Sequence, residues 1–179
     1  MRIERLRREH GVQVRWVHFP LHPETPSQGR SLEELFAGRG DIAARQAQMR
    51  ARMAEEGLPY GDRKMTFNSR LAQELAAWAD TRPGGAAIHD ALFRAYFVDC
   101  SNIGDPEVLV LVAASIGLAP DSAREVIVNR THKAAVDADW EKSRAYGISG
   151  VPTFVAGHHG VVGAQPYEVL EQLVQQARS

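Results

Sequence analysis

The stretch Arg144-Ala-Tyr-Gly-Ile-Ser-Gly-Val-Pro-Thr-Phe-Val155 leads out of a predicted helix into a short apolar run, and the remainder of the chain is interpreted from it. Residues 151–156 and 161–164 are two apolar runs joined by Gly157-His-His-Gly160, a pattern typical of a β-hairpin. From about Pro166 onward, apolar residues recur at helical spacing, which predicts a terminal helix. The chain is therefore expected to end in two strands and a helix.

The beginning of the chain predicts one further strand. Residues 1–9 are interpreted as the end of a helix, and Gly11 follows them. Residues 12–19 alternate between apolar and polar side chains, which favours a strand. Three prolines in residues 20–26 then end that strand, because proline donates no hydrogen bond to a sheet.

The middle of the chain, residues 31–146, is predicted to be almost entirely helical. Ser31 and Glu34 have the spacing of a capping box, and Asp105-Pro106 places an N-cap before a proline at the first helical position. Helices are expected at about residues 40–56, 68–81, 85–98, 105–117, 120–130 and 132–146. The sequence thus predicts a helical block between the first strand and the hairpin.

Composition excludes several classes of protein. The 179 residues include 21 basic and 22 acidic side chains and carry a net charge of −1, so a nucleic acid or an anionic membrane is not an expected partner. No apolar run approaches the roughly 18 to 20 residues of a membrane span, and residues 1–10 are too charged for a secretion signal. We expect one cytoplasmic domain that carries an insertion.

Four segments of the chain, in their order along the sequence, resemble the DsbA family of the thioredoxin superfamily and its FrnE-like branch in particular. Residues 144–155 resemble the family's helix, cis-proline loop and following strand, and residues 161–166 resemble the next strand and turn. Residues 14–23 resemble the second core strand with its exit loop, and residues 91–97 with 103–108 resemble the helical insertion. The resemblance covers nearly the whole chain.

The resemblance implies an α/β, thioredoxin-like fold of the DsbA type. The core would consist of residues 1–30 and 147–179, with residues 31–146 as an all-helical insertion domain. The family's first core strand and its Cys-x-x-C motif would precede Met1 and are missing from this sequence. A start assigned too late is one explanation, and a homodimer that buries the exposed sheet is another.

The same resemblance assigns a substrate groove to Gly150, Val151, Pro152 and Thr153, with a cis bond before Pro152. In the family this loop offers backbone hydrogen bonds to an extended peptide or to glutathione. From the residues alone, a simple turn at the start of a strand remains the alternative. No catalytic residue, metal ligand or cofactor is assigned to this sequence.

The single cysteine and four of the histidines are not expected to take part in catalysis or metal binding. Cys100 is the single cysteine and cannot form an internal disulfide, so we expect it to be inert, with redox sensing or crosslinking as alternatives. His158 and His159 are adjacent in a turn and are interpreted as solvated rather than metal-binding. His18 and His22 are interpreted as packed or rim histidines rather than catalytic bases.

The sequence therefore predicts a DsbA-family thiol–disulfide oxidoreductase by resemblance, inactive as given because it lacks the dithiol. A relative of the glutathione-dependent isomerases or transferases is one alternative, and a non-catalytic dimeric binding module is another. Expected partners are a protein or glutathione thiol or disulfide, with no nucleic acid and no membrane.

Overall fold

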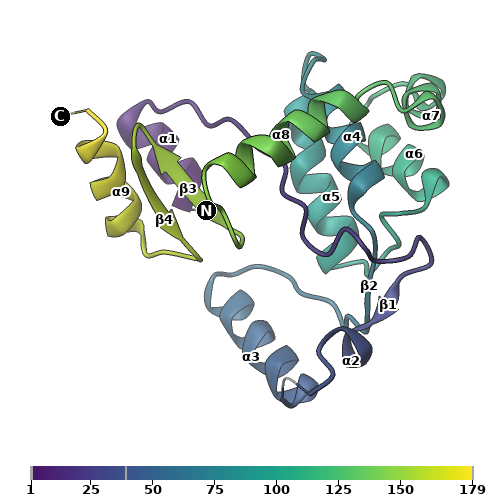
Figure 1. Ribbon diagram of the computed structural model, residues 1–179, viewed down its shortest axis with the longest axis horizontal. Coiled ribbons are helices and arrows are strands. Elements are labelled where there is room, and N and C mark those ends of the chain that lie inside the picture. The colour runs from purple at the N-terminus through teal and green to yellow at the C-terminus, as the bar shows by residue number, and fades with distance from the viewer. Residues whose placement is uncertain (1, 39, 179) are drawn as a thin grey trace. The chain divides into compact units, whose positions relative to one another are not determined.

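The computed structural model describes residues 2–38 and 40–178 and divides the chain into two compact units. Met1–Phe19 and Asp139–Ser179 form what we call the hairpin unit, and Pro20–Ala138 form the helical unit. Figure 1 shows the elements of each unit. The predicted domain boundaries, at residues 30/31 and 146/147, stay a prediction.

The hairpin unit contains the strands and terminal helix that the sequence predicts. Strands β3 (Thr153–Ala156) and β4 (His159–Val162) are antiparallel, and helix α9 (Tyr167–Gln176) follows them. The connection is only two residues long, and Gly157 occupies its first position with φ +60°. That geometry matches a type II′ turn, in which glycine adopts the positive φ without a steric penalty. His159 consequently belongs to β4 rather than to the turn.

One face of the hairpin packs on two helices. Side chains of Phe154 and Val161, which lie opposite each other in the register, pack against a buried cluster from α1 (Arg2–His10) and α9. The buried members of that cluster are Leu6, Tyr167, Leu170 and Val174. Because successive residues of a strand point to opposite faces, Val155 and Val162 lie on the other face, where both are exposed.

Polar contacts reinforce the packing of α1 on α9. The Tyr167 hydroxyl donates to Glu9 Oε2 at 2.6 Å, and His10 Nε2 lies 3.0 Å from Glu171 Oε1. The hydrogen bond to Glu9, together with burial and the charge of that carboxylate, raises the pKa of Tyr167 to about 12. The neutral phenol is therefore the form that the folded unit favours.

The strand predicted at residues 12–19 is wrong, because these residues form neither helix nor strand. A strand needs a neighbour for its N–H and C=O groups, and no described segment pairs with residues 12–19. Helix α8 (Lys133–Ala145) satisfies the main chain of His18 instead. The His18 N–H donates to Asp139 Oδ2 at 3.1 Å, and the Ser143 hydroxyl donates to the His18 carbonyl at 3.2 Å.

The helical unit confirms the predicted helical block. Its elements are β1 (Arg30–Ser31), α2 (Leu32–Leu35), α3 (Ile42–Glu55), β2 (Met65–Thr66), α4 (Arg70–Ala79), a 3₁₀ turn (Gly85–Ala87), α5 (Ile88–Phe97), α6 (Pro106–Ser115), α7 (Pro120–Asn129) and the first part of α8. The short strands β1 and β2 are antiparallel to each other. Helices α4 to α7 enclose the core, whose fully buried side chains include Leu75, Ile88 and Leu109.

Local capping signals explain where two of these helices begin. Ser31 and Glu34 form the predicted capping box at α2, with the Ser31 hydroxyl oxygen accepting from the Glu34 N–H at 3.0 Å. Asp105 caps α6 by accepting from the Glu107 N–H at 2.8 Å, and Pro106 occupies the first helical position. Among the described helices, none is both long and apolar enough to cross a bilayer.

Candidate substrate-binding loop

The loop predicted to bind substrate begins where α8 ends. Gly147 has φ +66° and donates to the Arg144 carbonyl at 2.9 Å, while Ile148 donates to the Ser143 carbonyl at 3.0 Å. This pair of bonds is a Schellman motif, in which glycine takes the left-handed position that closes a helix. The motif directs the chain out of α8 and into residues 149–152.

Two short hydrogen bonds fix the shape of the loop. The Thr153 hydroxyl donates to the Gly150 carbonyl at 2.7 Å, and the Gly163 N–H donates to the Pro152 carbonyl at 2.7 Å. The Val151–Pro152 peptide bond between these anchors is cis. Gly150, Val151, Pro152 and Thr153 thus form one compact turn at the start of β3.

Val151 is the residue of this turn that is open to a ligand. The residue is 48% exposed, and neither its N–H nor its C=O has a hydrogen-bond partner among the described residues. Both groups are strong hydrogen-bonding groups that need a partner from water or from another molecule. An extended peptide could take both bonds in the manner of a neighbouring strand.

Further backbone groups along β3 are also directed away from β4. Since Pro152 bonds to Gly163, the ladder to β4 continues at Phe154 and Ala156. In an antiparallel pair the residues between such bonded positions direct their N–H and C=O groups to the opposite edge. Thr153 and Val155 therefore direct theirs away from β4.

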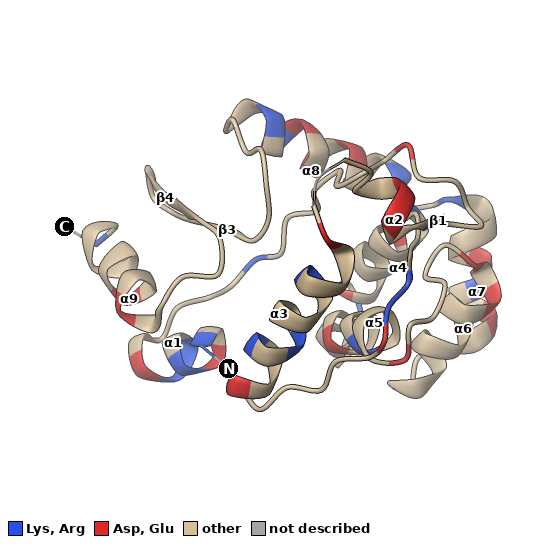
Figure 2. Cartoon of the chain, turned by 90° about the horizontal axis from the view of Figure 1, so that it is seen from below, with Lys and Arg blue, Asp and Glu red and all other residues tan. Residues whose placement is uncertain are grey.

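The segment that contains the loop and the hairpin has no charged residue. Residues 145–167 include no Lys, Arg, Asp or Glu, and in Figure 2 the strands β3 and β4 are tan while α1 contains residues of both charges. Three valines of this segment, Val151, Val155 and Val162, are about half exposed. The loop therefore presents apolar side chains and free backbone groups, which suit an uncharged extended ligand.

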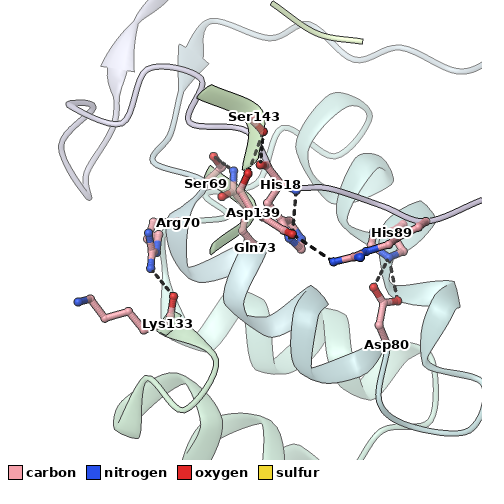
Figure 3. A network of polar contacts seen from close by, with 10 residues as sticks. His18, Ser69, Arg70, Gln73, Asp80, His89, Lys133, Asp139 and Ser143 are labelled. Atoms are coloured by element: carbon pink, nitrogen blue, oxygen red, sulfur yellow. Dashed lines mark hydrogen bonds and ion pairs between the residues drawn. The ribbon is translucent and has the colours of Figure 1, made fainter. Parts of the chain in front are cut away.

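His18 forms a polar cluster with Asp139 and Ser143 in the same unit, and its contacts do not resemble those of a catalytic base. His18 Nδ1 lies 2.9 Å from Asp139 Oδ2, and the same carboxylate oxygen accepts from the His18 N–H (Figure 3). Ser143 bonds to the carbonyls of both residues. Asp139 and Ser143 thereby fasten the residues before Phe19 to α8, which makes the cluster an anchor for irregular backbone.

Comparison with known proteins confirms the resemblance to the DsbA family. Residues 1–175 match the family model described as the DSBA-like thioredoxin domain. This chain belongs to that family. The DSBA-like chain is also similar to a probable DsbA oxidoreductase from Streptomyces coelicolor, with 30% sequence identity and a TM-score of 0.89, and the match covers 99% of this chain and 82% of that structure.

A second solved structure and one curated protein are also similar to this chain. A structure from Nitrosomonas europaea, provisionally named a protein disulfide isomerase, has 18% identity and a TM-score of 0.65 over 98% of this chain and 87% of its own, which shows the shared fold. The uncharacterized protein YwbO of Bacillus subtilis is 29% identical over 108 residues, which are 58% of this chain and 52% of that protein. The DSBA-like chain thus spans about half the length of that relative.

The other reactive side chains of the DSBA-like chain are described within their own units. Cys100 is partly buried in the helical unit, has φ +55°, and its thiol faces the Val98 carbonyl at 3.7 Å. Gly61 packs so closely on it that a Cβ there would lie 2.8 Å from the Cys100 sulfur. His158 and His159 are exposed, and no group of His, Cys, Asp and Glu in residues 2–38 and 40–178 has the arrangement of a metal site.

An ion-pair cluster in the helical unit was not predicted from the sequence. Glu74 on α4 is only 1% exposed and accepts from Arg70 Nε at 2.5 Å and from Arg130 Nε and Nη2 at 2.6 and 2.7 Å. Burial alone would raise the pKa of this carboxyl, but the hydrogen bonds and charges of Arg130 and Arg70 outweigh burial and lower it. A signal was present, because Glu74 shares the apolar helical stripe of Leu71 and Trp78.

Proposed function

We propose that the loop Gly150–Thr153 binds an extended polypeptide segment or glutathione as the thiol or disulfide partner of a DsbA-family oxidoreductase domain of the FrnE-like branch. The observation that supports this is Val151, whose exposed N–H and C=O have no partner among the described residues and adjoin the cis bond to Pro152. Thr153 and Gly163 hold those groups in place, so the loop is ordered before a ligand arrives. Such preorganisation lowers the entropic cost of binding.

The 179-residue chain does not carry out dithiol exchange in this proposal. Exchange proceeds when one thiolate attacks a disulfide and a second thiol resolves the mixed disulfide. The sequence contains one cysteine, Cys100, and it is partly buried at a site with no second thiol. We propose a cytoplasmic setting, where such a thiol stays reduced.

A non-catalytic binding module is the second candidate function. The exposed, uncharged valines Val151, Val155 and Val162 favour it, because they would serve a partner protein or a second copy without any thiol chemistry. In this candidate the loop binds polypeptide and the absence of a dithiol has no consequence. The two candidates differ in whether a glutathione disulfide is also recognised.

Nuclear magnetic resonance of the labelled chain tests the binding site. We expect oxidised glutathione, or a short peptide with a blocked cysteine, to shift the amide signals of Gly150, Val151 and Thr153 more than any signal of the helical unit. If the peptide shifts these signals and oxidised glutathione does not, the non-catalytic binding module is favoured. Absence of both shifts would refute the proposed site.

A matched pair of variants tests the role of the loop geometry. Thr153→Val removes the hydroxyl that holds the Gly150 carbonyl while keeping the side-chain shape, so we expect weaker binding of the same ligands. Thr131→Val in the helical unit serves as the control, because its hydroxyl bonds only to the neighbouring His132. Equal effects of the two changes would contradict the assignment.

Reduction of insulin by dithiothreitol tests the absence of turnover. We expect the rate with the 179-residue chain to equal that with Cys100→Ala and that of the uncatalysed reaction. Turnover that depends on Cys100 would show that a single thiol suffices.

A further inference from the structure

A small cavity lies in the helical unit where α4 begins. It measures about 250 Å³ and is lined by Ser27, Asn68, Arg70, Leu71, Gly104 and Arg130. Two of these six residues are arginines, and none is acidic. A cavity with this lining is a candidate site for an anion.

Arg130 lines this cavity and has hydrogen-bond donors that no described residue accepts. It ends α7 with φ +52°, a conformation that costs a residue with a side chain roughly 1 to 2 kcal/mol. Two of the five N–H bonds of its guanidinium point to Glu74. The other three have no acceptor among the described residues, although the side chain is only 41% exposed.

The ion-pair network that includes the two arginines of the cavity contains more cations than carboxylates. Arg70 and Arg130 share the buried carboxylate of Glu74, and Arg70 Nη2 also lies 2.7 Å from Asp137. Lys133 Nζ lies 3.7 Å from the same Asp137. Three cations are therefore paired with two carboxylates, and of these five groups only Arg70 and Arg130 line the cavity.

Backbone N–H groups at the start of α4 add to the positive electrostatic potential near the cavity. Its N-cap, Ser69, makes no capping hydrogen bond with its side chain, and Asn68 Oδ1 accepts only from the Arg70 N–H. The N–H of Leu71, a residue of the lining, has no acceptor among the described residues. The positive end of the helix dipole reinforces the guanidinium groups there.

We propose that this cavity binds a small oxyanion group, a phosphate or a carboxylate, through the guanidinium of Arg130, with the charge of Arg70 beside it. The planar guanidinium of Arg130 suits the oxygens of either group, and its two bonds to the buried Glu74 hold it in position. Arg70 contributes charge, because its Nε and Nη2 are bonded to Glu74, Asp137 and the Lys133 carbonyl. All six lining residues belong to the helical unit.

Isothermal titration of the 179-residue chain with inorganic phosphate and with acetate, at constant ionic strength in chloride, tests the proposal. We expect saturable binding of at least one anion. Arg130→Gln should weaken it about tenfold or more, because hydrogen bonds to charged groups are lost. Arg124→Gln is the control, since that exposed arginine also pairs with a glutamate but does not line this cavity.

A second variant keeps the test decisive if Arg130→Gln fails to fold. Asp137→Asn removes a half-exposed carboxylate and leaves Glu74 intact, so we expect it to tighten binding about two- to fivefold. A purely structural role for the arginines would not produce tighter binding. The proposal is overturned if neither anion binds, if Arg124→Gln weakens binding as much as Arg130→Gln, or if Asp137→Asn does not tighten it.

Discussion

Replacing Glu74 by glutamine should destabilise the helical unit by about 3 kcal/mol. Glutamine keeps the size of the side chain but removes its charge and leaves one oxygen where two accepted three charged hydrogen bonds. Removing one partner of a buried ion pair costs about 3 to 5 kcal/mol. We expect the lower end, because the Arg130 side chain is 41% exposed and water can solvate it.

Urea unfolding followed by far-ultraviolet circular dichroism measures this loss. Glu107→Gln is a matched control, because Glu107 also receives a forked contact from an arginine, Arg124, but is 69% exposed. Exposed pairs contribute about 1 kcal/mol or less, so the control should lose little. Equal losses in Glu74→Gln and Glu107→Gln would refute the reasoning from burial.

The pH dependence of the same difference gives a second check. The folded state lowers the pKa of Glu74 below its ordinary value of 4.5, so its contribution to stability is present above that pH and is lost as the pH falls through the folded pKa. The difference in the free energy of unfolding between the wild type and Glu74→Gln should therefore become smaller in acid. A difference that does not change with pH would mean that the charge of Glu74 is not the cause.

Three further outcomes follow from contacts in both units. Among the four tyrosines, Tyr167 should ionise near pH 12 in an absorbance titration, and Glu9→Gln should move the pKa of Tyr167 back toward 10. If no tyrosine ionised near pH 12, that result would contradict the hydrogen bond to Glu9. Asp139→Ala should speed hydrogen exchange of the His18 amide about tenfold or more, since a charged acceptor is lost, whereas unchanged exchange would argue against this anchor. Asp105→Ala should cost about 1 kcal/mol in urea unfolding through the lost helix cap, and an unchanged midpoint would be the contrary result.

Elements defined by local chemistry could be predicted from the sequence. The capping box at Ser31, the Asp105-Pro106 start of α6 and the glycine turn of the hairpin each depend on a few neighbouring residues, and all three are present. The strand expected at residues 12–19 depended instead on a distant partner for its backbone. Alternation in the sequence cannot show whether such a partner exists.

The candidate sites differ in the same way. Gly150 to Thr153 were predicted because a family resemblance identified them, whereas the open backbone of Val151 became visible only from its hydrogen bonds. The cluster around Glu74 joins residues 56 positions apart along the chain, so spacing could not reveal it. Its one local sign was a carboxylate on an apolar helical stripe.

Helix α3 differs from the other helices of its unit in a way that matters for handling the protein. None of its 14 residues is buried, and its described ties include Gln46, which bonds to the Arg63 carbonyl and to the Tyr60 hydroxyl. Isolated helices of this length are only marginally stable in water, so α3 should open locally while the core stays folded. Because it carries Arg45, Arg50 and Arg52, trypsin should nick the native protein there first and leave the rest of the helical unit largely intact.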